Sequence, residues 1–155
     1  MRKLLLSGLL LAAACKSTTT IVPAPAPEPA PGVVTSPAYI GPRPAVDAFL
    51  AAVKAQDIQA LSGAWGDKEG PVRDSKKVSR ADMEMRALVI LRCLRHERWR
   101  VVAEAPSIDG ERVFQIELVR GTQKGVTDFF TAQASDRWYV RTVNLDVLKE
   151  YCSAK

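Results

Sequence analysis

The sequence predicts an α+β domain in which N-terminal helices pack on a curved antiparallel sheet. Between Pro44 and Trp99, apolar residues recur three or four positions apart, which is the period of a helix. Between Arg100 and Leu145 they alternate with polar residues, which is the period of a strand. The chain has 155 residues, 47% of them hydrophobic and 25% charged, which suffices for one core plus extensions.

Residues 1–14 have the pattern of an export signal. Arg2 and Lys3 form a basic head, and the apolar run over 4–14 is shorter than the roughly 20 residues that span a bilayer as a helix. Three alanines stand directly before Cys15. This junction resembles the lipobox of bacterial lipoproteins, which implies cleavage before Cys15 and lipidation (palmitate) of its thiol. The alternative is an ordinary secretory signal cut nearby, with Cys15 as an incidental thiol.

Residues 15–43 are expected to form a disordered tether. Eight of the ten prolines lie in residues 16–44, with too few large apolar side chains to bury a core. The alternation from Pro23 to Pro31 favours an extended spacer, and a ligand for a proline-recognition domain is the alternative. Lys16 follows Cys15 where many lipoproteins of double-membraned bacteria carry an aspartate that retains them at the inner membrane. That resemblance implies an exported, lipid-anchored protein on the outer membrane, facing the periplasm.

Two helices are expected at the start of the domain, which spans residues 44–155. The segment "PAVDAFLAAVKAQDIQALSGAW" has helical spacing, and Pro44 suits a first turn. Asp57 follows a slight break in the pattern and is placed to cap the second helix. Residues 66–78 contain two glycines, a proline and seven charged residues without an apolar period, and they predict a surface loop.

A long helix is expected over residues 81–99. Ser79 and Asp82 match a capping box at its start. The apolar residues from Ala87 to Leu91 cover nearly its whole circumference, and such a helix belongs at the centre of a domain, wrapped by other elements.

Four strands and a short C-terminal helix complete the domain. The strands are expected over residues 100–105, 112–120, 126–134 and 137–145. Their connections contain Asp109-Gly110, the stretch 121–125 and Ser135-Asp136, and such short connections favour an antiparallel meander. The terminal helix is expected over residues 146–151.

Over residues 44–152 the chain resembles the nuclear transport factor 2-like superfamily. The resemblance rests on "FLAAVKAQDIQALSGAW", on the long helix and on the meander that ends in "DRWYVRTVNL". It implies a cone, in which the helices pack into the concave face of a strongly bent sheet. A generic α+β domain of another topology is the alternative.

The resemblance leaves the activity open, because that superfamily includes isomerases, dehydratases and epoxide hydrolases as well as many non-catalytic binding and assembly domains. Glu117 and Asp128 are candidates for a general base if they face into the cone, where Tyr139 and Arg141 would orient a substrate. Strand alternation instead predicts that both carboxylates lie on the solvated face of the sheet.

Three arginines, Arg92, Arg95 and Arg98, lie at steps of three near the expected end of the long helix. They form a candidate patch for an acidic ligand, a phosphate or a lipid headgroup, because a guanidinium presents a planar fork of donors. The alternative is that these arginines and His96, the only histidine, complement the negative end of the helix dipole.

Cysteine usage links the export signal to the fold. Lipidation of Cys15 would leave Cys93 and Cys152 as an even pair in an oxidising compartment, which predicts a disulfide between them. Two buried free thiols are the alternative. One histidine and two cysteines without paired spacing do not make a zinc site or a Ser-His-Asp triad, so we expect neither a metal nor another cofactor.

Together these features predict a cell-envelope lipoprotein that displays a non-catalytic ligand-binding or assembly domain. Its expected partners are the membrane, through the lipid, and a small apolar ligand or an envelope protein. A homodimer through the open sheet face is a further alternative. The net charge of +5 is mild and dispersed, so nucleic-acid binding is not expected. The alternative is a lipid-anchored enzyme of the same fold, of isomerase, dehydratase or hydrolase type, that uses carboxylates in the cone.

Overall fold

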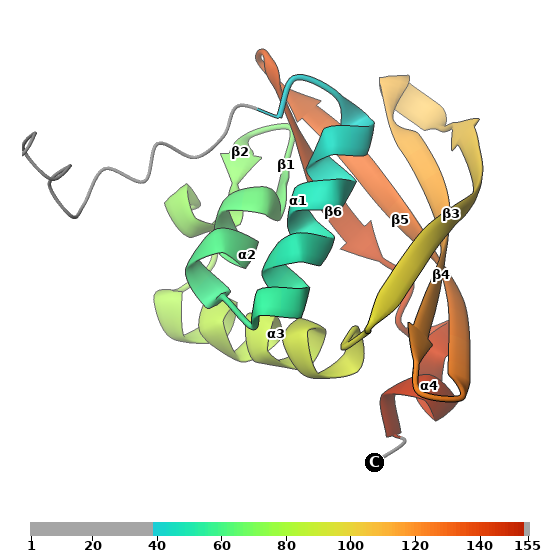
Figure 1. Ribbon diagram of the computed structural model, residues 1–155. Coiled ribbons are helices and arrows are strands. Elements are labelled where there is room, and N and C mark those ends of the chain that lie inside the picture. Colours follow the sequence, from blue (N-terminus) through green and yellow to red (C-terminus); the bar gives the residue numbers. More distant parts are fainter. Residues whose placement is uncertain (1–38, 154–155) are drawn as a thin grey trace, which may run out of the picture. The chain divides into compact units, whose positions relative to one another are not determined.

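The computed structural model describes residues 39–153 and confirms the predicted α+β class (Figure 1). The predicted export signal, Cys15 and most of the proline-rich segment lie outside the described residues. The main elements are α1 (Pro42–Ala55), α2 (Ile58–Ala64), β1 (Gly66–Asp67), β2 (Gly70–Pro71), α3 (Arg80–Cys93), β3 (Arg98–Pro106), β4 (Arg112–Arg120), β5 (Gln123–Ala134), β6 (Arg137–Val143) and α4 (Lys149–Ser153). Helices α1–α3 lie on one side of the sheet formed by β3–β6.

The sheet is the predicted antiparallel meander, in the order β3-β4-β5-β6. Phe114, Ile116 and Leu118 of β4 are fully buried, whereas the residues between them point to the other face. A bulge at Val102 of β3 interrupts its register with β4, and a bulge at Arg141 of β6 interrupts its register with β5. Bulges of this kind bend a strand and increase its local twist.

The first two helices begin and end for local reasons. Two prolines stand at the start of α1, where an amide hydrogen has no helical partner, and Gln56 ends it in a left-handed conformation with φ 57°. The predicted cap of α2 is confirmed, because the Asp57 carboxylate accepts a hydrogen bond from the amide of Ala60 at 3.0 Å. Phe49 of α1 then packs edge-on against Phe129 of β5, with ring centroids 5.9 Å apart.

The prediction of a surface loop over residues 66–78 is wrong for its first part, where β1 and β2 form a small antiparallel hairpin. Gly70 adopts φ +125°, which side chains disfavour, and the Asp67 carboxylate accepts a hydrogen bond from the amide of Glu69 at 2.8 Å. Trp65, just before the hairpin, forms a parallel bridge with Val140 of β6. The hairpin therefore depends on contacts with the main sheet that no local pattern reports.

Helix α3 begins as predicted, with the Ser79 hydroxyl accepting a hydrogen bond from the amide of Asp82 at 3.1 Å. It ends at Cys93, however, and not near Trp99 as expected. The amide of Glu97 donates to the carbonyl of Val119 at 2.8 Å, and Trp99 already pairs with β4. Hydrogen bonding to the sheet therefore replaces the last helical turns.

The expected central position of α3 is also wrong. Only one side of the helix is buried, and it carries Met83, Ala87 and Leu91. On the opposite side, three large apolar side chains are exposed: Met85 (63%), Leu88 (56%) and Val89 (55%). Helix α3 is therefore apolar on two sides, of which one packs on the core and the other lies at the surface.

The C-terminal segment closes one end of the sheet, with Leu148 and Tyr151 buried against β5. The structure contains the predicted disulfide between Cys93 at the end of α3 and Cys152 in α4. Gly125 of β5 leaves room for this segment, because a Cβ atom there would lie 2.6 Å from Leu148 Cδ2 and 2.9 Å from Tyr151 Cγ.

Candidate functional site

The two carboxylates considered for acid–base chemistry lie on the sheet face that points away from the core. Glu117 and Asp128 each stand between fully or nearly fully buried neighbours in the strand, and each is only partly exposed. The Glu117 carboxylate accepts two hydrogen bonds from Arg100, at 2.8 and 3.1 Å. The hydrogen bond from Arg100 lowers the pKa of Glu117, which is opposite to what a general base at neutral pH needs.

The two residues expected to orient a substrate have structural contacts instead. Tyr139, which lies on β6, is buried. Arg141 donates a hydrogen bond to the buried Glu111 carboxylate at 2.9 Å and lies over the ring of Phe130. The four residues considered for catalysis therefore do not converge on one cavity.

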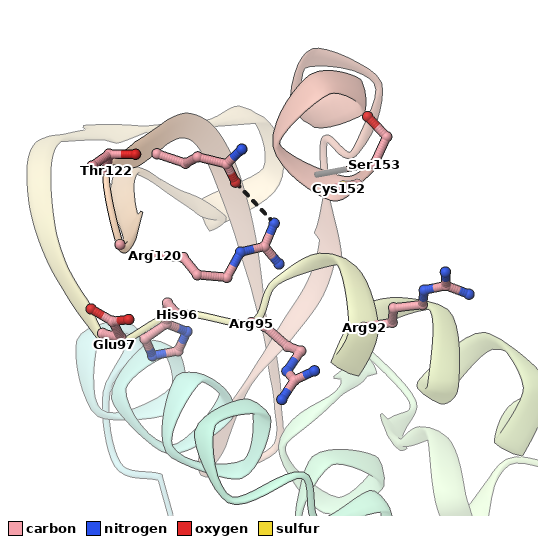
Figure 2. Close-up of a pocket in the computed structure, with 10 residues that line it drawn as sticks. Arg92, Arg95, His96, Glu97, Arg120, Thr122, Cys152 and Ser153 are labelled. Carbon is pink, nitrogen blue, oxygen red and sulfur yellow. Dashed lines mark hydrogen bonds between the residues drawn. The ribbon is translucent and has the colours of Figure 1, made fainter. Parts of the chain in front are cut away.

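An open pocket of about 770 Å³ lies where three separate parts of the chain meet (Figure 2). The last turn of α3 contributes Arg92, and the connection to β3 contributes Arg95, His96 and Glu97. The end of β4 contributes Arg120, the following turn contributes residues 121 and 122, and the start of β5 contributes Gln123. Helix α4 contributes Cys152 and Ser153. We call this the arginine pocket.

The guanidinium groups of the arginine pocket differ in their contacts. Arg120 donates to the carbonyl of Tyr151 at 2.6 Å and to Gln123 Oε1 at 3.2 Å (dashed in Figure 2). Arg92 and Arg95 are exposed and have neither an ion-pair nor a hydrogen-bond partner for their side chains within residues 39–153. Two cationic groups at the pocket are therefore available to a ligand, beside a single carboxylate, that of Glu97.

His96 forms part of the wall of the pocket and is 8% exposed. Its Nδ1 lies 2.9 Å from the carbonyl of Leu94, which can only accept, so Nδ1 carries the proton. Its Nε2 is buried and has no hydrogen-bond partner in the described part of the chain. Burial lowers the pKa of His96, an effect that Lys54 reinforces and the Leu94 carbonyl opposes. Burial thus disfavours the charged imidazole, and His96 meets the end of α3 through its hydrogen bond to the carbonyl of Leu94, the C-cap residue.

The structure places only two of the three arginines of the predicted patch together. Because α3 ends at Cys93, Arg92, Arg95 and Arg98 do not share a helix face. Arg92 and Arg95 still line one pocket, whereas Arg98 lies on β3 outside it. Sequence spacing could not find Arg120, which comes from another strand; the predicted disulfide was the one signal that placed the C-terminal segment nearby.

A smaller apolar groove of about 260 Å³ lies between α3 and β6. Its walls are formed mostly by apolar side chains, namely Phe49, Trp65, Val89, Ile90, Val140, Val143 and Leu145, together with Thr142, Arg86 and Arg141. Among residues 39–153 there is no group of three or more His, Cys, Asp or Glu side chains placed to hold a metal ion. The described helices are also too short or too polar to cross a membrane.

Comparison with known proteins finds no matching family model, no matching curated protein and no matching solved structure.

Proposed function

We propose that this chain is an exported, lipid-anchored protein whose α+β domain binds an anionic group in the arginine pocket without transforming it. The observation that carries the proposal is the pair Arg92 and Arg95, two exposed guanidinium groups without partners in residues 39–153 beside one pocket. A guanidinium offers several donors to a phosphate, sulfate or carboxylate, so unpaired arginines beside a cavity favour an anionic ligand.

The cell-envelope part of the proposal rests on the sequence. The apolar run before Cys15 and the proline-rich segment after it support lipidation and a tether, and the outer membrane facing the periplasm is the proposed location. The Cys93–Cys152 disulfide supports an oxidising compartment. The order of helices, hairpin and four-stranded meander supports the finer proposal of a nuclear transport factor 2-like cone.

A binding role agrees better with the interior than a catalytic one. The space between the helices and the sheet is occupied by the chain's own apolar side chains, including Phe49, Phe114, Leu118 and Phe129. A catalytic site needs convergent polar groups in a cavity, and Glu117 is instead engaged with Arg100 on the outer face.

The test is titration of the full-length chain, held in phosphatidylcholine nanodiscs, with inorganic phosphate. We expect Arg95→Gln to weaken phosphate binding by at least about tenfold, because a hydrogen bond to a charged group contributes roughly 1.5–3 kcal/mol. Arg98→Gln is the matched control, since it removes the same charge outside the pocket, and its affinity should equal that of the parent chain. Failure of phosphate to bind at millimolar concentration, or equal effects of the two substitutions, would overturn the proposal.

A homodimer through the sheet is a second candidate, favoured by two exposed valines on the outer face. Val102 is 43% exposed and Val126 is 42% exposed. Light scattering of the full-length chain should then show a dimer whose mass falls to that of the monomer in Val126→Lys. A monomer in the parent chain would contradict this candidate.

A further inference from the structure

The arginine pocket does not end at α4, because it shares residues with a second, shallow depression. This depression, of about 440 Å³, is lined by Val89, Arg92, Cys93, Leu145, Lys149, Cys152 and Ser153. Arg92, Cys152 and Ser153 also line the arginine pocket. Figure 2 shows Arg92 and Ser153 on the same side of the view.

The second depression in turn shares residues with the apolar groove between α3 and β6. Val89 and Leu145 line both. The arginine pocket, the shallow depression and the apolar groove therefore adjoin in series along α3, each sharing side chains with the next. We call this series the α3 channel.

The chemistry of the α3 channel changes from one end to the other. At one end are Arg92 and Arg95, which have no partner within residues 39–153. In the middle, Val89 is 55% exposed and shares the shallow depression with the apolar side chains of Leu145, Cys93 and Cys152 as well as with Arg92, Lys149 and Ser153. At the other end the side chains of Phe49 and Val140, which are buried in the core, reach the floor of the groove.

We infer that the α3 channel binds one anionic amphiphile, with its charged head at Arg92 and Arg95 and its apolar chain along Val89 and Leu145 into the groove. This inference rests on the proposed anion site and names the class of its ligand. Two observations support this occupant: charge complementarity at the arginine end, and the continuity of the lining with a mostly apolar groove. An apolar chain in the groove would cover Val89, which water otherwise contacts.

Two features of the groove fit a chain better than a second polar group. Trp65 is fixed at its wall, because its indole donates a hydrogen bond to the carbonyl of Arg141 at 3.2 Å. Arg141 itself is held by Glu111, with 2.9 Å between Nη2 and Oε2. Trp65 and Arg141 are thus held by other parts of the chain, and apart from Arg86 and Thr142 the remaining side chains that line the groove are apolar.

The test compares three probes on the full-length chain in phosphatidylcholine nanodiscs: inorganic phosphate, dodecyl phosphate and the neutral dodecyl maltoside. We expect dodecyl phosphate to bind at least about tenfold more tightly than inorganic phosphate, because each buried methylene adds favourable transfer free energy. Dodecyl maltoside should bind no better than it does to nanodiscs without the protein. A dodecyl phosphate with a nitroxide on its chain should quench Trp65 fluorescence, measured as the difference from Trp65→Phe.

Substitution separates the head from the chain. Val89→Asn should remove most of the tenfold gain of dodecyl phosphate while leaving inorganic phosphate binding unchanged, which also shows that the variant is folded. Val102→Asn is the matched control, because it places the same polar group at an exposed valine outside the channel. Arg95→Gln should weaken both phosphate probes.

Each contrary outcome has a distinct meaning. If inorganic phosphate binds and dodecyl phosphate binds no more tightly, or if Val89→Asn and Val102→Asn behave alike, the channel inference fails and the anion site stands. If neither phosphate probe binds, both proposals fail. Binding to phosphatidylglycerol vesicles but not to dispersed dodecyl phosphate would show that the face contacts a bilayer, and a dimer that Val89→Asn disrupts would show a second copy; either result overturns the single-amphiphile site.

Discussion

Loss of the Cys93–Cys152 disulfide should lower the free energy of unfolding by about 4 kcal/mol. The bond joins residues 59 positions apart, and chain-entropy reasoning gives a stabilisation of that size for a closed loop of this length. The comparison is between the oxidised full-length chain and the same chain after reduction, with Cys93→Ala/Cys152→Ala as the covalent control. In urea, the midpoint should fall by about 2 M, from the usual dependence of unfolding free energy on denaturant.

The native contacts around the bond make the result specific. Tyr151 donates a hydrogen bond to the carbonyl of Arg95 at 2.6 Å, and Arg120 donates to the carbonyl of Tyr151 at 2.6 Å. Because these contacts keep α4 in place after reduction, the affinity for phosphate should change little while global stability falls. Equal urea midpoints for the oxidised and reduced chains, or two reactive thiols in the exported chain before any reductant is added, would refute the reasoning.

Three further changes test other parts of the structure. Gly125→Ala should destabilise the domain by about 1–3 kcal/mol in thermal unfolding, because the new Cβ would press on Leu148 and Tyr151; an unchanged melting temperature would contradict that packing. Burial lowers the pKa of His96 below its ordinary 6.5, so the unfolded chain binds the proton more readily than the folded chain. The free energy of unfolding should therefore be lower at pH 5.5 than at pH 8 in urea titrations. His96→Gln should lack this contribution to the pH dependence. Ser79→Ala should cost about 1 kcal/mol through loss of the cap of α3, with parent-like unfolding as the opposing result.

Local signals in the sequence were sufficient for the starts of helices and for the strands. Asp57 and Ser79 cap α2 and α3 as predicted, because a cap needs only one side chain and an amide three residues away. The alternation through Phe114, Ile116 and Leu118 placed β4 correctly, because one face of a meander packs on the core and the other meets water.

The errors arose where distant residues compete for the backbone. The sequence pattern continues as a helix to Trp99, but residues 97–99 form hydrogen bonds with β4 instead. The hairpin at Gly66–Pro71 depends on the adjacent bridge from Trp65 to Val140. In both places the local pattern lacked the partner that decides the conformation.

The candidate site was predictable only in part. The spacing of Arg92 and Arg95 predicts that they lie together, and both line the pocket. They do not share a helix face, however, because α3 ends before Arg95. Arg120 and Ser153 had no signal of their own, since the end of β4 and the last helix bring them to the pocket. Arg98 was included wrongly, because its strand carries it away.

By itself, the sequence determined the α+β class, the order of the main elements, the helix caps and the pairing of Cys93 with Cys152, because these follow from periodicity, short-range hydrogen bonds and cysteine number. Only the tertiary structure decided where α3 ends, which of its apolar faces is exposed and which arginines line one pocket. It also decided that Val89 and Leu145 line the depression next to that pocket. The physical reason is that these features depend on hydrogen bonds and packing between segments far apart in the chain, whose energies no local pattern contains.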